Sequence, residues 1–132
     1  MIRKLTFSDF DTILKVINDS AQAYRGIIPK DRWKEPYMPA EELRDEIESG
    51  VRFYSWVEDD LIVGVMGIQP VQDTVLIRHS YVLTKYQGRG IGGKLLEHLT
   101  SLAITPEILV GTWKAATWAV RFYEEHGFTS VS

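Results

Sequence analysis

The chain has 132 residues, of which 45% are apolar and 25% are charged, and it carries a formal net charge of −3. This length allows a single domain over residues 1–132 with a real core and is too short for a second one. The acidic balance excludes a general basic surface for nucleic acid, and the lack of cysteine excludes a thiol nucleophile, a thiolate metal site and a disulfide framework. The sequence shows no long apolar run or signal-like N-terminus, so we expect a cytoplasmic protein with no membrane partner.

The first half of the chain predicts one strand and two helices. Apolar residues indicate a short strand at 2–5, after which Ser8 caps a helix with Asp11 in the capping-box position. The apolar face of this helix consists of Phe10, Ile13, Leu14, Ile17 and Ala21. An irregular segment with three prolines follows at 24–39, and a second, short helix at 41–49 ends at Gly50.

The second half predicts more strands and two further helices. In chain order we expect strands at 52–57, 61–69 and 74–83, a helix at 91–103, a strand at 108–111 and a helix at 115–126. Strands joined by short turns are expected to pair antiparallel, and the β-α-β crossover near the end to be parallel and right-handed. The predicted fold class is a mixed α/β fold with the order β-α-α-β-β-β-α-β-α.

Residues 87–93 read Gln-Gly-Arg-Gly-Ile-Gly-Gly and lie between an apolar stretch that ends at Val82 and the helix predicted at 91–103. Glycines allow a sharp turn that presents bare backbone N–H groups. The first turn of the helix adds more free N–H groups and the positive end of the helix dipole. The segment therefore predicts an anion-binding loop, and the anion bound in this way is most often a phosphate.

Three phosphate-binding motifs overlap on this run. A P-loop needs Ser or Thr to hold Mg²⁺ where this chain has Leu95. A dinucleotide fingerprint needs an acidic residue at the end of the next strand, whereas Glu107 lies at its start. Gln87-x-x-Gly90-x-Gly92 matches the third motif, Q-x-x-G-x-G, which binds the pyrophosphate of acyl-CoA in N-acyltransferases. A less specific anion loop or a plain turn stays open on these residues alone.

A second segment favours the third motif. Residues 118–128 read W-A-V-R-F-Y-E-E-H-G-F and match the A-x-x-F-Y-x-x-x-G-F element of the GNAT superfamily of N-acetyltransferases, at the separation from the glycine run that the family shows. The lead-in at 82–87 resembles the family's V-x-P-x-Y-Q, with Thr84 in the proline place. The chain thus resembles a GNAT acetyltransferase. The resemblance implies acetyl-CoA as cosubstrate, the element order predicted above and no metal.

The resemblance also implies strands that this chain does not supply. GNAT folds normally close with two more strands after Gly-Phe, whereas residues 128–132 can only begin the sixth strand. We expect the C-terminal strands to be truncated, either because the chain is a fragment or because another chain, as in a homodimer, completes the sheet. A bare strand edge would favour such pairing.

By resemblance, the third long strand holds the pantetheine arm, the glycine run holds the diphosphate and the last helix supplies a phenol. The implied cofactor-binding residues are Tyr81, Val82, Gln87, Gly88, Arg89, Gly90, Ile91, Gly92, Gly93 and Tyr123. Tyr123 matches the family tyrosine near the CoA sulfur, where a phenol that is protonated at neutral pH can assist the departing thiolate as a catalytic acid. The alternative for Tyr123 is a core tyrosine with its hydroxyl at the surface.

His79 is the candidate catalytic base. Side chains alternate along a strand, so we expect Ile77, His79 and Tyr81 on one face, and an imidazole titrates near neutrality. The alternative is a packed, hydrogen-bonded core histidine. Two family positions differ: the frequent catalytic glutamate is replaced by Leu76, and an asparagine that contacts pantetheine is replaced by Ala116.

The irregular segment after the first helix is expected to select the acceptor, with Tyr24, Trp33 and Tyr37 as candidate binding residues and Trp113 and Trp118 close by. Its mixed charge leaves a small amine, an amino acid and a peptide amine open. The main hypothesis is transfer of acetyl from acetyl-CoA to a primary amine by direct attack in a ternary complex. The alternative is a non-catalytic acyl-CoA-binding or sensing module on the same fold.

Overall fold

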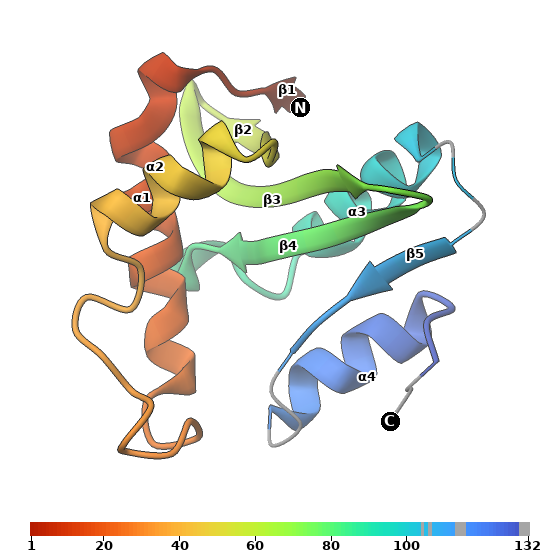
Figure 1. Ribbon diagram of the computed structural model, residues 1–132. Helices are drawn as coiled ribbons and strands as arrows, with labels where there is room; N and C mark the ends of the chain where they lie inside the picture. The colour runs from red at the N-terminus through yellow and green to blue at the C-terminus, as the bar shows by residue number, and fades with distance from the viewer. Residues whose placement is uncertain (104, 106, 113–115, 130–132) are drawn as a thin grey trace.

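The computed structural model describes residues 1–103, 105, 107–112 and 116–129. It is a mixed α/β fold in which the described residues form a five-stranded sheet and four α-helices (Figure 1). The strands are β1 (Ile2–Lys4), β2 (Arg52–Glu58), β3 (Leu61–Val71), β4 (Thr74–Val82) and β5 (Glu107–Val110). The helices are α1 (Phe10–Ser20), α2 (Ala40–Glu48), α3 (Ile91–Leu102) and α4 (Thr117–Glu125), with short 3-10 helices η1 (Phe7–Asp9), η2 (Ala21–Tyr24) and η3 (Thr84–Tyr86).

The strands lie across the sheet in chain order, from β1 to β5. Neighbours from β1 to β4 pair antiparallel, and β5 pairs parallel to β4 after the chain has passed through α3. The predicted order of elements is therefore confirmed. The turn between β2 and β3 uses Asp59 and Asp60 at left-handed φ values of 49° and 64°, a conformation that aspartate tolerates better than most residues.

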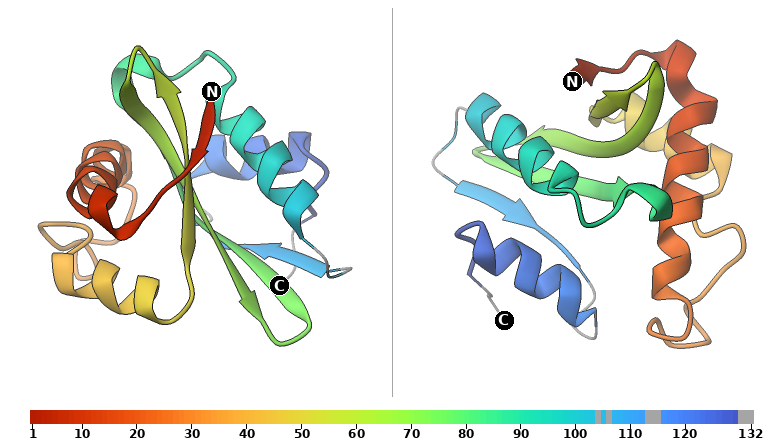
Figure 2. Two further views of the ribbon diagram at one scale, coloured as in Figure 1. Left: turned by 90° about the horizontal axis from the view of Figure 1, so that it is seen from above. Right: turned by 180° about the vertical axis from the view of Figure 1, so that it is seen from behind.

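Helices cover both faces of the sheet. One face lies under α1 and α2, and the other under α3 and α4 (Figure 2). Each face buries an apolar cluster of its own, the first around Ile13, Ile17, Leu43 and Val65 and the second around Val63, Met66, Leu95 and Leu99. These two clusters hold the sheet as a rigid platform for the elements at its edge.

The start of the first helix differs from the prediction. The backbone N–H of Thr6 donates to the Asp9 carboxylate over 2.9 Å, and this pair forms the capping box of η1. Ser8 only exchanges a hydrogen bond with the Thr6 hydroxyl, and α1 begins at Phe10. The cap predicted at Ser8 and Asp11 is therefore wrong by two residues, because a turn of 3-10 helix precedes the α-helix.

β4 contains a bulge. The register shifts between Val65 and Gly67 of β3, so that a single residue there lies opposite both His79 and Ser80 of β4. His79 adopts a left-handed φ of 55° at this point. An inserted residue of this kind bends a strand and interrupts the alternation of its side chains.

The bulge overturns the predicted faces of β4. Ile77 is buried in the cluster under α3, whereas Tyr81 packs against the cluster under α1 and α2. The prediction that Ile77, His79 and Tyr81 share one face is therefore wrong, because the alternation is broken between the first of these residues and the last.

β4 pairs with β5 along only part of its length. The Cα partners run from Thr74 opposite Glu107 to Ile77 opposite Val110. Beyond this point the two strands diverge (Figure 1). Residues 78–82 of β4, called the open half below, therefore have no strand on their outer edge among the described residues.

The chain after α4 is short. Phe128 and Thr129 follow the helix without strand structure. Residues 130–132, on which most of the predicted sixth strand falls, lie outside the described residues, as does Ala115, the predicted first residue of the last helix.

Candidate active site

A cleft of about 400 Å³ lies where β4 and β5 separate. Its walls come from the end of α1, η2, the open half of β4, the loop before α3, and α4. Every predicted cofactor-binding residue except Arg89 lines it, as does Tyr24 among the predicted acceptor residues. Segments about 100 residues apart in the sequence therefore meet in one space.

The glycine run forms the loop that leads into α3. Gly88 and Gly90 have φ values of 81° and 78°, which a residue with a Cβ rarely adopts. The first backbone hydrogen bond of α3 runs from the Lys94 N–H to the Gly90 carbonyl, over 3.1 Å. The N–H groups of residues 91–93 therefore have no carbonyl partner within the helix. They lie at the positive end of the helix dipole, beside the cleft.

The other two glycines of the run allow α4 to approach α3. A Cβ on Gly92 would lie 3.4 Å from the Phe122 ring, and one on Gly93 would lie 2.9 Å from Nε2 of His126. Phe122 and the start of α3 thus close one side of the cleft. The run serves both the loop conformation and helix packing, whereas the sequence alone indicated only the loop.

The open half of β4 presents backbone groups to the cleft. Leu83 donates its N–H to Val63 of β3, so the alternation of an antiparallel pair turns the N–H and C=O of Val82 outward. The Val82 carbonyl accepts hydrogen bonds from Ser20 Oγ at 2.8 Å and from Gln87 Nε2 at 3.1 Å. Gln87 therefore ties the glycine loop to β4, and the outward N–H of Val82 is left for a ligand.

Tyr123 points from α4 toward the same strand. Burial is the main cause that raises the pKa of Tyr123 to about 12, and a weaker interaction with the nearby Ser80 side chain lowers it. The phenol is therefore protonated throughout the neutral range and available as a hydrogen-bond donor at the floor of the cleft.

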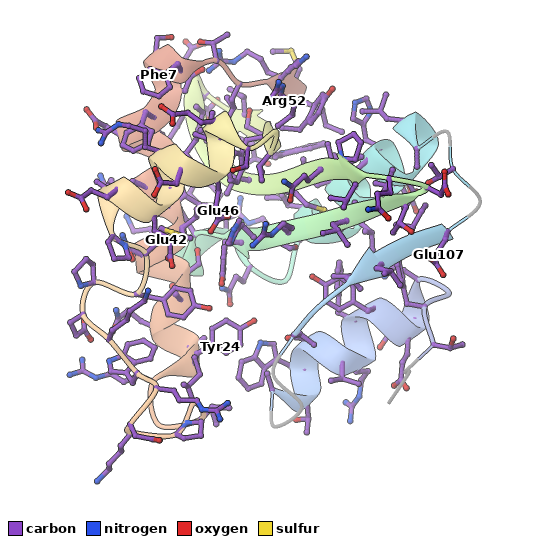
Figure 3. The ribbon with its side chains drawn as sticks, viewed as in Figure 1. Phe7, Tyr24, Glu42, Glu46, Arg52 and Glu107 are labelled. Atoms are coloured by element: carbon purple, nitrogen blue, oxygen red, sulfur yellow. The ribbon has the colours of Figure 1, made fainter. Side chains whose placement is uncertain are left out.

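Aromatic side chains form the wall opposite the glycine loop. The Tyr24 ring lies between η2 and α4 (Figure 3), 5.7 Å from Trp118 and 6.3 Å from Tyr81. Tyr37 stands behind this wall, 6.3 Å from Tyr24 and 6.5 Å from Tyr81, and Trp33 packs 5.8 Å from Tyr37. Of the predicted acceptor residues, only Tyr24 reaches the cleft, and the other two support it.

His79 does not line the cleft. Its ring stacks 6.1 Å from Phe53 and hydrogen-bonds to the Glu46 carboxylate, which extends from α2 toward β4 (Figure 3) and also lies 3.6 Å from the Arg78 guanidinium. The predicted alternative, a packed and hydrogen-bonded histidine, describes this geometry. The bulge turned the side chain toward α2, and no feature of the local sequence marked that bulge.

The Glu46 carboxylate is held in its charged form. Burial opposes its ionisation, but the hydrogen bond from His79 and the neighbouring cationic groups outweigh burial and lower the pKa of Glu46 below its usual value. The pair therefore anchors the bulge from behind, on the face opposite Tyr123.

Arg89 within the glycine run and Lys94 directly after it both contact residues on the side of β2. Arg89 lies 3.5 Å from Glu58 and 5.0 Å above the Tyr86 ring, and Lys94 lies 4.9 Å above the Trp56 ring. Arg89 is the one predicted cofactor residue that does not line the cleft. The positive potential in the cleft therefore comes from backbone N–H groups.

Ser20, Ser80 and Phe122 line the cleft but were not among the predicted site residues. The sequence could have marked Ser20 as a site residue, because it is a polar residue that continues the buried face of α1. The sequence could not have marked Ser80, because strict alternation along a strand does not distinguish it from its neighbours. Trp113, expected near the site, lies outside the described residues.

Among the described residues, no cluster of three or more His, Cys, Asp or Glu side chains is placed to hold a metal ion. No helix among these residues is long and apolar enough to cross a membrane.

A model of the acetyltransferase (GNAT) domain family matches residues 16–132. The chain therefore belongs to the GNAT family of acetyltransferases, as its glycine run and last helix implied. No curated protein matches the sequence significantly.

Solved structures share the fold. The PaiA N-acetyltransferase of Thermoplasma acidophilum, in complex with coenzyme A, aligns over 98% of this chain and 89% of its own with a TM-score of 0.78 and 22% identity. A GNAT family acetyltransferase of Elizabethkingia anophelis with acetyl-CoA bound aligns over 100% and 77% with a TM-score of 0.72 and 22% identity. An acetyltransferase of Clostridium acetobutylicum with acetyl-CoA aligns over 100% and 91% with a TM-score of 0.75 and 17% identity.

Proposed function

We propose that the protein transfers an acetyl group from acetyl-CoA to a primary amine by direct attack in a ternary complex. One observation carries the proposal: a single cleft combines the bare N–H groups at the start of α3, the open edge of β4 and the phenol of Tyr123. Membership of the GNAT family and the CoA or acetyl-CoA bound by similar structures support it.

The residues present fit coenzyme A. A diphosphate would lie on the N–H groups of residues 91–93, and nothing lies within 4 Å of the Cβ positions of Gly88 and Gly90, so the loop leaves room for it. The pantetheine arm would extend the sheet along the open half of β4, where the Val82 N–H faces outward. When bound, acetyl-CoA supplies the activated acetyl group, and its sulfur would lie beside Tyr123.

Tyr123 acts mainly by hydrogen bonding. Complete transfer of its proton is uphill, because its pKa of about 12 exceeds that of a thiol, which is about 8.5 for cysteine. Its hydroxyl instead donates a hydrogen bond to the sulfur as negative charge develops there. A donor aimed at developing charge in a buried site contributes to the rate without any net proton transfer.

The cleft has no side-chain base among the residues described as lining it. Burial disfavours the charged form of an amine and so lowers its pKa. The cleft itself therefore favours the neutral amine that attack requires, and the amine's proton leaves to solvent. Positioning of the amine against the thioester then supplies much of the acceleration.

The proposal is tested by calorimetry with CoA, ATP and NAD, followed by an assay of free thiol release from acetyl-CoA with a panel of primary amines. We expect CoA alone to bind and at least one amine to release thiol together with the N-acetylated product. Preferential binding of ATP or NAD would contradict the proposal.

A non-catalytic acyl-CoA-binding module is the second candidate. Ala116, fully buried at the N-terminus of α4, stands where related sequences carry an asparagine that contacts pantetheine, and no base lines the described cleft. Tight CoA binding without thiol release for any amine in the panel would favour this candidate over the transferase.

A further inference from the structure

We infer that the acceptor is a primary amine carried on an uncharged aromatic or apolar body, in preference to a polyamine or an amino acid. The inference rests on the proposed function and names the substrate class of the same cleft.

Three separate segments bring aromatic rings to the acceptor side. Tyr24 of η2, Tyr81 of β4 and Trp118 of α4 all line the cleft. The ring of Tyr24 is tilted by 32° against Trp118 and stands edge-on to Tyr81 at 86°. Trp118 is 47% exposed, so part of its face is not covered by these neighbours. Ring faces and edges of this kind bury an apolar body and attract a further ring in tilted or edge-on contact.

The described lining of the cleft offers no charge to a second ionic group, because none of those residues is charged. Asp19, the carboxylate beside the cleft at the end of α1, is turned to the N–H and hydroxyl of Thr84 at 3.4 and 3.5 Å, and Glu58 pairs with Arg89. An extra ammonium or a carboxylate on the acceptor would therefore lose its hydration without gaining a counter-charge.

The pKa shifts of the two phenols in the aromatic wall also indicate an environment that disfavours charge. Burial is the main cause that raises the pKa of Tyr24 and of Tyr81. A site that holds these groups neutral also favours the neutral form of an amine. An acceptor with one amino group and an uncharged body satisfies both the aromatic wall and the absence of charge.

Calorimetry measures the preference directly on the protein saturated with CoA, whose diphosphate would occupy the bare N–H groups at the start of α3. The ligands are 2-phenylethylamine, phenylalanine, which adds one carboxylate to the same framework, and spermidine. We expect 2-phenylethylamine to bind at least about tenfold more tightly than either of the others. Equal or tighter binding of phenylalanine or spermidine, or no binding of 2-phenylethylamine, would overturn the inference.

A charge placed in the wall sharpens the test. Trp118→Glu puts a carboxylate in the first turn of α4, where the helix dipole tolerates it. The preference should then move toward spermidine by about tenfold or more. Phe7→Glu, at an exposed aromatic residue on the far end of the molecule (Figure 3), should leave the ratio of affinities unchanged. No shift in Trp118→Glu would show that Trp118 does not form the acceptor wall.

The same experiment separates this inference from the proposed function. Preferred binding of 2-phenylethylamine without thiol release from acetyl-CoA would support the inferred acceptor class and contradict the proposed transferase activity. Thiol release that is fastest with spermidine would support the transferase activity and contradict the acceptor class.

Discussion

The two halves of β4 differ in what lies on their outer edge. Residues 74–77 pair with β5 and close the sheet, whereas the open half at 78–82 borders the cleft. Both halves pair with β3 along their other edge. The strand therefore completes the sheet over its first half and lines the cleft over its second.

The bulge at His79 and Ser80 marks the change from one half to the other. It directs Ser80 toward Tyr123 and His79 toward Glu46 on the opposite face. The comparison teaches that the site is built where strand pairing stops, and that groups on both faces of the sheet hold this point in place. The following changes test that division, beginning with the largest expected effect.

Tyr123→Phe removes the hydroxyl that the open half of β4 faces. We expect kcat to fall about 100-fold, because a donor to the developing thiolate is lost, while the Kd for CoA changes by less than about threefold. The measurement is thiol release with the best amine, alongside calorimetry with CoA. Tyr54→Phe, at a tyrosine outside the cleft, is the matched control and should keep the full rate. An unchanged kcat in Tyr123→Phe would exclude the hydrogen-bonding role.

Gly90→Ala tests the loop that faces the open half. The loop holds Gly90 at a φ of 78°, which costs a residue with a Cβ about 1–2 kcal/mol. The Kd for CoA should therefore rise about tenfold. Gly111→Ala is the matched control after β5, since its Cβ would meet nothing within 4 Å and its φ is not left-handed. Equal affinities of the two variants would show that the loop does not hold the diphosphate.

Glu46→Gln tests the support behind the bulge. Loss of the charged partner of His79 should lower the free energy of unfolding by about 1 kcal/mol at pH 7, measured with urea. Glu42→Gln, in an exposed pair with Lys34, should cost less than about 0.5 kcal/mol.

The pH dependence of that difference has a defined sign. The folded protein lowers the pKa of Glu46 below the ordinary value of 4.5. The carboxylate's contribution to stability is therefore complete above pH 4.5 and is lost as the pH falls through the lower pKa of the folded state. The gap between wild type and Glu46→Gln should thus close in acid. A gap that widens there would contradict the assignment.

Much of the fold was predictable because it follows from local patterns. Apolar periodicity gave each described strand and α-helix within about two residues at its ends, and the short turns gave the antiparallel pairs of β2 with β3 and of β3 with β4. The meeting of the glycine run and Tyr123 at one cleft was predictable, because their residue types and spacing are tied to one kind of site. These signals needed no knowledge of the rest of the molecule.

The misplaced residues depend on contacts between distant segments. His79 left the predicted face because of a bulge that Glu46, 33 residues away, stabilises. Arg89 left the predicted site because Glu58 of β2 lies within its reach. Ser80 entered the site through the same bulge. The residues next to these positions determine neither the register shift nor the ion pairs, so the sequence alone could not place these side chains.

The most direct test of the account is a crystal structure of the protein with CoA. We predict diphosphate oxygens within about 3 Å of the backbone nitrogens of residues 91–93, the pantetheine arm along the open half of β4, and the sulfur beside the Tyr123 hydroxyl. A diphosphate bound away from the start of α3, or a thiol end that points away from Tyr123, would contradict it.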